Sequence, residues 1–176
     1  MTRYAALLRG VNVGGINLKM ADVKTVFENA GLENVKTVLA SGNVLFDSDA
    51  AASVLKPKIE AAMRDRFGYE AWVHVLGLAA IEKIVDAFPF DAEREGWHPY
   101  VIFTLDPVLA AELLALQASL GEAEESIRGS DGVIYWTVER GNTLGSVFAK
   151  QTAKARHKAT TTTRNLRTLQ KLLTSR

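Results

Sequence analysis

Residues 4–15 have the sequence YAALLRGVNVGG, and this stretch determines how the first half of the chain is expected to fold. It begins with a short apolar run, residues 4–8, and ends in glycine punctuation, which is the pattern of a buried strand followed by a loop. Residues 20–30 then place their apolar side chains on one helical face, and Gly31 supplies a left-handed helix stop. We therefore expect a strand, a glycine-rich loop and a helix in succession.

Beyond this stretch, the chain continues with the elements of a ferredoxin-like unit. Ser41-Gly42-Asn43 is a turn-forming trio between two short apolar runs. Gly68 ends an amphipathic segment in which Pro57 is expected within the first helical turn. We predict strands at residues 35–39, 44–46 and 71–76 and a helix at residues 55–67. The resulting order, strand, helix, strand, strand, helix, strand, is that of the ferredoxin-like unit.

The same order begins again after a linking helix, which Pro89 ends, and a charged loop. Asp106-Pro107 has the residues of a helix N-cap and first turn, and Asp131-Gly132 is a strong hairpin signal. We predict strands at residues 100–105, 126–128 and 133–138 and helices at residues 109–120, 146–158 and 160–173. The last helix stands where a fourth strand would complete the second unit.

These elements predict an α+β fold of two ferredoxin-like βαββα(β) halves packed together, with a C-terminal helical segment. The expected division is residues 1–77 for the first half, residues 78–99 for a linking helix and loop, and residues 100–176 for the second half with its basic C-terminal helices. A chain of 176 residues can bury a sizeable core without disulfides or a metal.

The composition excludes several kinds of catalytic and metal-binding site. The chain contains no cysteine, which excludes thiol nucleophiles and cysteine zinc sites, and its three histidines have neither HxH nor HExxH spacing. We expect no metal and no cofactor, and we expect His74 at an exposed strand position. The cytoplasm is the expected compartment, and the apolar run near the start is too short for a membrane span.

Charge is sorted along the chain although the formal net charge is only +1. Residues 1–140 carry 13 basic and 20 acidic side chains, whereas residues 141–176 carry eight basic and no acidic ones. Six of these eight cations fall on two predicted helical faces: Lys150, Lys154, Lys158, Arg164, Arg167 and Lys171. Either these two faces are simply exposed to solvent, or they bind the phosphates of a nucleic acid through electrostatic attraction. Residues 160–163, all threonine, are expected to supply the N-cap hydroxyl of the last helix.

The loop after the first strand is the first candidate site. Glycine N–H groups can approach an anion there, the following helix adds positive partial charge, and Arg9 and Lys19 flank the loop. Its spacing is neither Walker A nor GxGxxG, so turn glycines with positive φ are the alternative. Ser41 and Asn43 offer a hydroxyl and an amide to a ligand, or they form an ordinary hairpin turn.

Several of these segments resemble the bacterial domain-of-unknown-function family DUF1697. The segments are residues 4–15 with Met20, Ser41-Gly42-Asn43, and Thr162-Thr163-Arg164-Asn165 with Thr168. The resemblance covers nearly the whole chain and implies a cytoplasmic bacterial protein of two ferredoxin-like halves, without assigning an activity. The chain departs from the family pattern at Val147, where other members tend to have a basic residue after the serine.

Our first hypothesis is a binding module for an anionic small ligand, such as a phosphate-bearing one, on which three motifs converge. The residues are Arg9, Gly10, Asn12, Gly14, Gly15, Lys19, Ser41, Asn43, Arg164 and Asn165. The alternatives are nucleic-acid binding through the basic segment, and an enzyme on a phosphorylated metabolite with Arg9, Lys19 and Arg164 as electrostatic stabilisers. A fourth interpretation is structural, with buried hydrogen bonds among Arg9, Asn12, Asn43 and Asn165. No nucleophile or general base stands out, and the sequence leaves the oligomeric state open.

Overall fold

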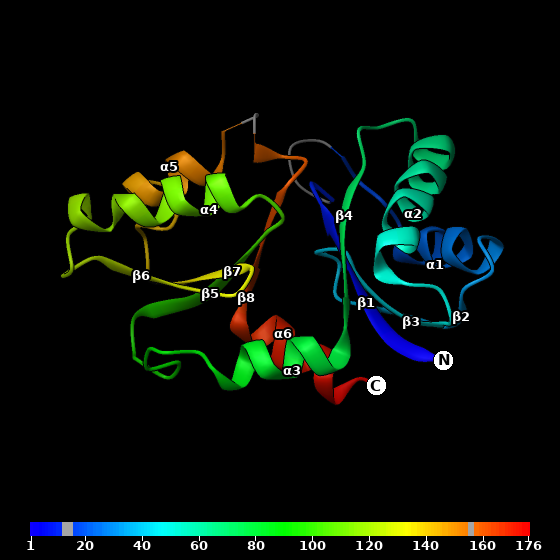
Figure 1. The fold of residues 1–176 in the computed structure, drawn as a ribbon, viewed down its shortest axis with the longest axis horizontal. Coiled ribbons are helices and arrows are strands. Elements are labelled where there is room, and N and C mark those ends of the chain that lie inside the picture. Colours follow the sequence, from blue (N-terminus) through cyan, green and yellow to red (C-terminus); the bar gives the residue numbers. More distant parts are fainter. Residues whose placement is uncertain (12–15, 155–156) are drawn as a thin grey trace. The chain divides into compact units, whose positions relative to one another are not determined.

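The computed structural model describes residues 1–11, 16–154 and 157–176 (Figure 1). The chain forms two compact units, each described here by itself. Residues 1–83 together with 170–176 make the first unit, and residues 84–169 make the second.

The first unit contains β1 (Thr2–Arg9), α1 (Met20–Asn29), β2 (Glu33–Val38), β3 (Asn43–Ser48), α2 (Ala52–Phe67) and β4 (Trp72–Gly77). Its antiparallel sheet has the order β2-β3-β1-β4, so β1 is a central strand and β4 an edge strand. Because side chains alternate between the faces of a strand, Ala6 and Leu8 enter the helix-side core, while Leu7 and Arg9 lie on the opposite face.

Helices α1 and α2 cover one face of this sheet (Figure 1). Their buried apolar side chains, among them Val23, Phe27, Leu55 and Ile59, share one core with the sheet. Each such side chain contributes about 1.5–3 kcal/mol on full burial. Gly68 has a φ of 68° and ends α2, as predicted.

Two details of the first unit differ from the prediction. Helix α2 begins at Ala52, so Pro57 lies inside the helix and not in its first turn. The prediction began too late because the apolar periodicity that marks the helix starts only at Leu55. His74 is only 2% exposed, so the expected exposed position is wrong. Its cross-strand neighbour Leu7 is also buried, because this sheet is buried on both faces.

The second unit contains β5 (Trp97–Thr104), α4 (Pro107–Leu114), a short 3-10 helix η1 (Ala115–Ser119), β6 (Glu125–Ser130), β7 (Val133–Glu139), α5 (Val147–Thr152) and β8 (Thr161–Asn165). Its strand order, β6-β7-β5-β8, repeats that of the first sheet. Ile102, Leu113, Trp136 and Phe148 belong to the core between this sheet and its helices. The α+β class and the two ferredoxin-like halves are thereby confirmed.

Strand β8 corrects the predicted C-terminal segment. The helix expected over residues 160–173 begins only at Leu166, as α6 (Leu166–Thr174), and residues 161–165 pair with β5 instead. The run of threonines favours extended backbone, because β-branched side chains fit a pleated surface better than a helix. The second unit therefore has the fourth strand that the sequence analysis missed.

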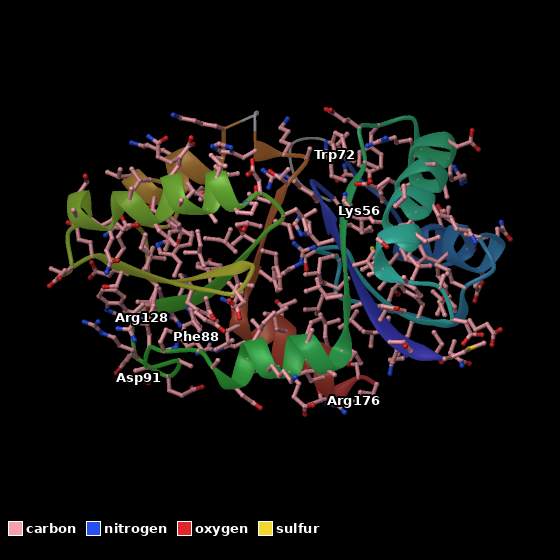
Figure 2. The ribbon with its side chains drawn as sticks, viewed as in Figure 1. Lys56, Trp72, Phe88, Asp91, Arg128 and Arg176 are labelled. Carbon is pink, nitrogen blue, oxygen red and sulfur yellow. The ribbon has the colours of Figure 1, made fainter. Side chains whose placement is uncertain are left out.

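Two helices begin in one unit and end in the other. The division between the units falls within α3 (Leu78–Asp86) and again within α6. Within the first unit, Arg176, which follows α6, lies with its Nη2 atom 3.0 Å from Oε1 of Glu82 on α3. Figure 2 labels Arg176 beside these helices. The first unit is thus assembled from two separate parts of the chain.

Asp106 caps α4 as predicted, because its Oδ1 accepts hydrogen bonds from the N–H groups of Val108 (2.9 Å) and Leu109 (3.4 Å). Asp106→Ala removes this acceptor, so we expect the free energy of unfolding to fall by about 1 kcal/mol and the melting temperature by about 2–4 °C. Calorimetry measures both. Asp106→Asn keeps a capping acceptor and is expected to melt close to the wild type; a loss equal to that of alanine would contradict the capping role.

Candidate functional site

Two of the predicted motifs lie side by side in the first unit. The N–H of Leu8 donates to the carbonyl oxygen of Gly42 at 2.8 Å, and Leu7 is the cross-strand partner of Asn43. A Cβ atom at Gly42 would lie 3.0 Å from Cβ of Leu8 and 3.2 Å from Cβ of Val11. The end of β1 and the turn Ser41–Asn43 are therefore in close contact.

Asn43 holds this turn together. Its side chain is fully buried, and Nδ2 donates to the carbonyl oxygen of Val38 and to Oγ of Ser41, both at 2.9 Å. Both amide hydrogens of Asn43 thus serve the protein itself. Ser41 is exposed, and its hydroxyl can still donate a hydrogen bond after accepting one from Asn43.

The backbone of the same turn is strained. Leu39 has a φ of 63°, in the left-handed region where a side chain costs about 1 kcal/mol or more, whereas Gly42, with a φ of 89°, has no side chain and adopts this region without that cost. Leu39 is also 43% exposed, so its conformation is not explained by burial of its side chain. Strained positions of this kind are concentrated at functional sites.

Arg9 is the last residue of β1 and lies on the sheet face opposite the helices. Its side chain is half-buried, and this burial lowers the pKa of Arg9 below its ordinary value because it disfavours the charged form. The same face carries the buried polar side chains Asn43 and His74, on either side of Leu7 in the register. Polar side chains from three neighbouring strands therefore meet at this end of the sheet.

The other predicted site residues of the first unit lie on either side of the end of β1. Gly10 follows Arg9 with a φ of 73°, is exposed, and has open space where a Cβ would stand. Lys19 is exposed and directly precedes α1. The predictions for Asn12, Gly14 and Gly15 lie outside the described residues.

Arg164 and Asn165 belong to β8 of the second unit. Arg164 is 7% exposed, and its Nη1 donates to Oγ1 of Thr162 and to the carbonyl oxygen of Thr163, both at 2.9 Å. Its predicted place on the charged face of a helix is wrong, because it lies in a strand. Asn165 Oδ1 accepts from the N–H of Arg167 at 2.9 Å, in place of the expected cap by a threonine hydroxyl. The convergence of this motif with those of the first unit stays a prediction.

The lysine face predicted for the basic segment is also wrong. Helix α5 is capped by Ser146 and ends at Thr152 after six residues, so Lys154 and Lys158 lie beyond it. A single face through Lys150 and these two lysines would need a helix about twice as long. Arg167 and Lys171 are exposed on α6, and Nη2 of Arg167 lies 4.0 Å from a carboxylate oxygen of Glu93.

Trp72, the cross-strand partner of Arg9 on β4, was not among the predicted site residues. Its position beside Arg9 in the sheet follows from the strand register, which cannot be read from a single sequence.

Among the described residues, no three histidine, aspartate or glutamate side chains gather as a metal site. In the same part of the chain, every helix is too short or too polar to cross a membrane.

Comparison with known proteins gives a family and a fold. The family described as "Protein of unknown function (DUF1697)" matches residues 1–135. The solved structure of the conserved bacterial protein SP0830 from Streptococcus pneumoniae is similar, with a TM-score of 0.81 and 25% sequence identity over 99% of this chain and 98% of that one. No curated protein matches the chain.

The close approach at Gly42 predicts a specific sensitivity. Gly42→Ala places a Cβ against Leu8 and Val11 in addition to straining the backbone, so we expect a loss of about 2–4 kcal/mol in the free energy of unfolding, measured by urea denaturation. Gly68→Ala is the matched control, since Gly68 also has a positive φ but nothing lies within 4 Å of the added Cβ. It is expected to lose only about 1 kcal/mol. Equal losses would show that the contact does not matter.

Proposed function

Because the chain belongs to the DUF1697 family, which has no assigned activity, we propose a function from the site itself: the first unit binds an anionic small ligand, such as a phosphate-bearing one, at the end of β1. The observation that carries this proposal is the half-buried guanidinium of Arg9, placed where β1 ends beside the exposed Gly10. Arg9 is the group that contacts the ligand.

Partial burial of Arg9 supports this role because it strengthens the attraction between the guanidinium and a bound anion. A guanidinium that is partly removed from water lies in a medium of lower dielectric constant, where its attraction to an anion is stronger than in bulk water. Arginine also matches the geometry of phosphate and carboxylate oxygens, to which it can donate two parallel hydrogen bonds.

The neighbouring residues have distinct parts in the proposal. Ser41 offers a hydroxyl donor at the turn, and Lys19 adds an exposed positive charge before α1. Asn43 acts as a positioning residue, because its amide hydrogens hold the turn against β1. Gly10 leaves room for a ligand to approach the backbone.

The other functions considered stay predictions. With α5 ending at Thr152, no observation favours nucleic-acid binding through a continuous lysine face. An enzyme on a phosphorylated metabolite would use the same arginine for electrostatic stabilisation, but it would also need a nucleophile or base. The cytoplasmic location is likewise a prediction.

The test measures binding of inorganic phosphate and of a phosphate monoester by isothermal titration calorimetry. Arg9→Ala removes charge-assisted hydrogen bonds worth about 1.5–3 kcal/mol, so we expect affinity to fall about 10- to 100-fold. Arg9→Lys keeps the charge without the paired donors and is expected to lie between Arg9→Ala and the wild type.

The matched control is Arg3→Ala. Arg3 lies on the same strand and the same face, at the other end of β1, where it pairs with Asp47 at 3.2 Å. This variant is expected to bind phosphate as the wild type does. Unchanged affinity in Arg9→Ala would refute the proposed site, and affinity for single-stranded DNA that falls steeply with salt would favour the nucleic-acid alternative instead.

A further inference from the structure

His98 lies near the start of β5, on the helix-side face of the second sheet. In that sheet β5 lies between β7 and β8 (Figure 1). Alternation along the strand places the imidazole on the same face as Tyr100 and Ile102, and Ile102 belongs to the core under the helices. The ring centroids of His98 and Tyr100 are 5.8 Å apart. His98 is partly exposed, whereas the other two histidines, His74 and His157, are only 2% and 3% exposed.

Strand register brings Arg140 to the same face from the side of β7. The N–H of Arg140 donates to the carbonyl oxygen of Gly96 at 2.8 Å, which continues the antiparallel ladder one residue beyond the pair Trp97–Glu139. Arg140 is therefore a diagonal neighbour of His98, and such neighbours lie about 7–8 Å apart. The side chain is exposed, and in the described part of the chain its guanidinium has no hydrogen bond or ion pair.

Arg167 reaches the same end of the sheet from the side of β8. Tyr100 is paired with Asn165, and Arg167 follows two residues later, with its N–H bonded to Oδ1 of Asn165 at 2.9 Å. Its Nη2 atom lies 4.0 Å from Oε2 of Glu93, whose side chain is 81% exposed. An exposed ion pair at this distance is weak, so it does not prevent Arg167 from binding a ligand.

Both guanidinium groups act on the imidazole between them. Burial lowers the pKa of His98, and the positive charges of Arg140 and Arg167 lower it further, because all three effects disfavour the imidazolium. The two carboxylates that flank the cluster along the chain point elsewhere: Glu93 contacts Arg167, and Glu139 lies on the opposite face of the sheet. The imidazole is therefore neutral at pH 7 and has two cations beside it.

We propose that His98, Arg140 and Arg167 form an oxyanion site in the second unit, which takes phosphate-type dianions. The two guanidinium groups donate hydrogen bonds to the oxyanion, and His98 adds a third charged donor once it is protonated. Binding is therefore coupled to the uptake of one proton from solvent by the imidazole, because the bound anion favours the imidazolium. The inference goes beyond the proposed function and does not rest on it, since no residue of the first unit takes part.

Inorganic sulfate is the probe, because it has the shape of phosphate and stays a dianion throughout the range in which histidine titrates. The Hε1 signal of His98 is followed by ¹H NMR from about pH 5 to about pH 8, in sodium sulfate and in sodium chloride of equal ionic strength. We expect sulfate to move the midpoint of the His98 titration to higher pH. The buried His74 and His157 are internal references, and His98→Gln assigns the signal by removing it.

The variants Arg140→Gln and Arg167→Gln separate repulsion from binding. In chloride, each is expected to raise the His98 midpoint, because one repelling charge is gone. Sulfate is then expected to raise it little further, since losing one guanidinium weakens sulfate binding about 10-fold or more. The matched control is Arg94→Gln, which removes a cation 3.7 Å from the ring centroid of Trp97, on the opposite face. It is expected to titrate as the wild type does in both salts.

Arg9→Ala separates this inference from the proposed function. It is expected to leave the sulfate-dependent shift of His98 unchanged, because Arg9 belongs to the first unit. Equal midpoints in sulfate and chloride, or a sulfate shift that survives in both Arg140→Gln and Arg167→Gln, would overturn the site in the second unit and leave the proposed site at Arg9 standing. Loss of the shift in Arg9→Ala would assign the effect to the first unit and overturn this inference as well. Unchanged signals of the two buried histidines show that each variant is folded.

Discussion

The alternation of side chains along β1 is the constraint on which the first unit depends. Leu8 enters the core beneath α1 and α2, so Arg9, the next residue, has to lie on the other face beside Trp72. A slip of one residue in the pairing with β3 would exchange the faces and turn the guanidinium toward the apolar core. Burying that charge without a partner would cost several kcal/mol, and the tight approach of Gly42 to Leu8 opposes the slip as well.

Local sequence features predicted much of the fold. The elements that they did not predict depend on pairing between strands that are distant in the sequence. Glycines, apolar periodicity and the Asp106 cap predicted the order of strands and helices, and the turn Ser41–Asn43 proved to lie against β1. Strand β8 was missed because TTTRN has no apolar alternation, and its identity comes from β5 across the sheet. A helix of six residues, such as α5, is too short to show a period of its own. The neighbours of Trp72 depend on strand register, which no spacing within one element reveals.

The two arginines of the sequence motif have different environments. In the second unit, the Nη1 atom of Arg164 is bonded to Thr162 and Thr163 of its own strand, so part of its hydrogen-bonding capacity stabilises the fold. In the first unit, Arg9 lies at the end of a strand, next to an exposed glycine. The same residue type thus has a structural role that is visible in one half and a proposed ligand-binding role in the other.

The division of the first unit between two parts of the chain has a consequence for biosynthesis. Residues 170–176 follow the whole second unit along the chain, yet they belong to the first, where Arg176 pairs with Glu82. A ribosome therefore completes residues 84–169 before it supplies the final piece of the unit that it began earlier. The sheet around β1 can form early, but the segment that joins α3 reaches it only after the second unit has emerged. In the order of synthesis, the unit that is started first is the one finished last.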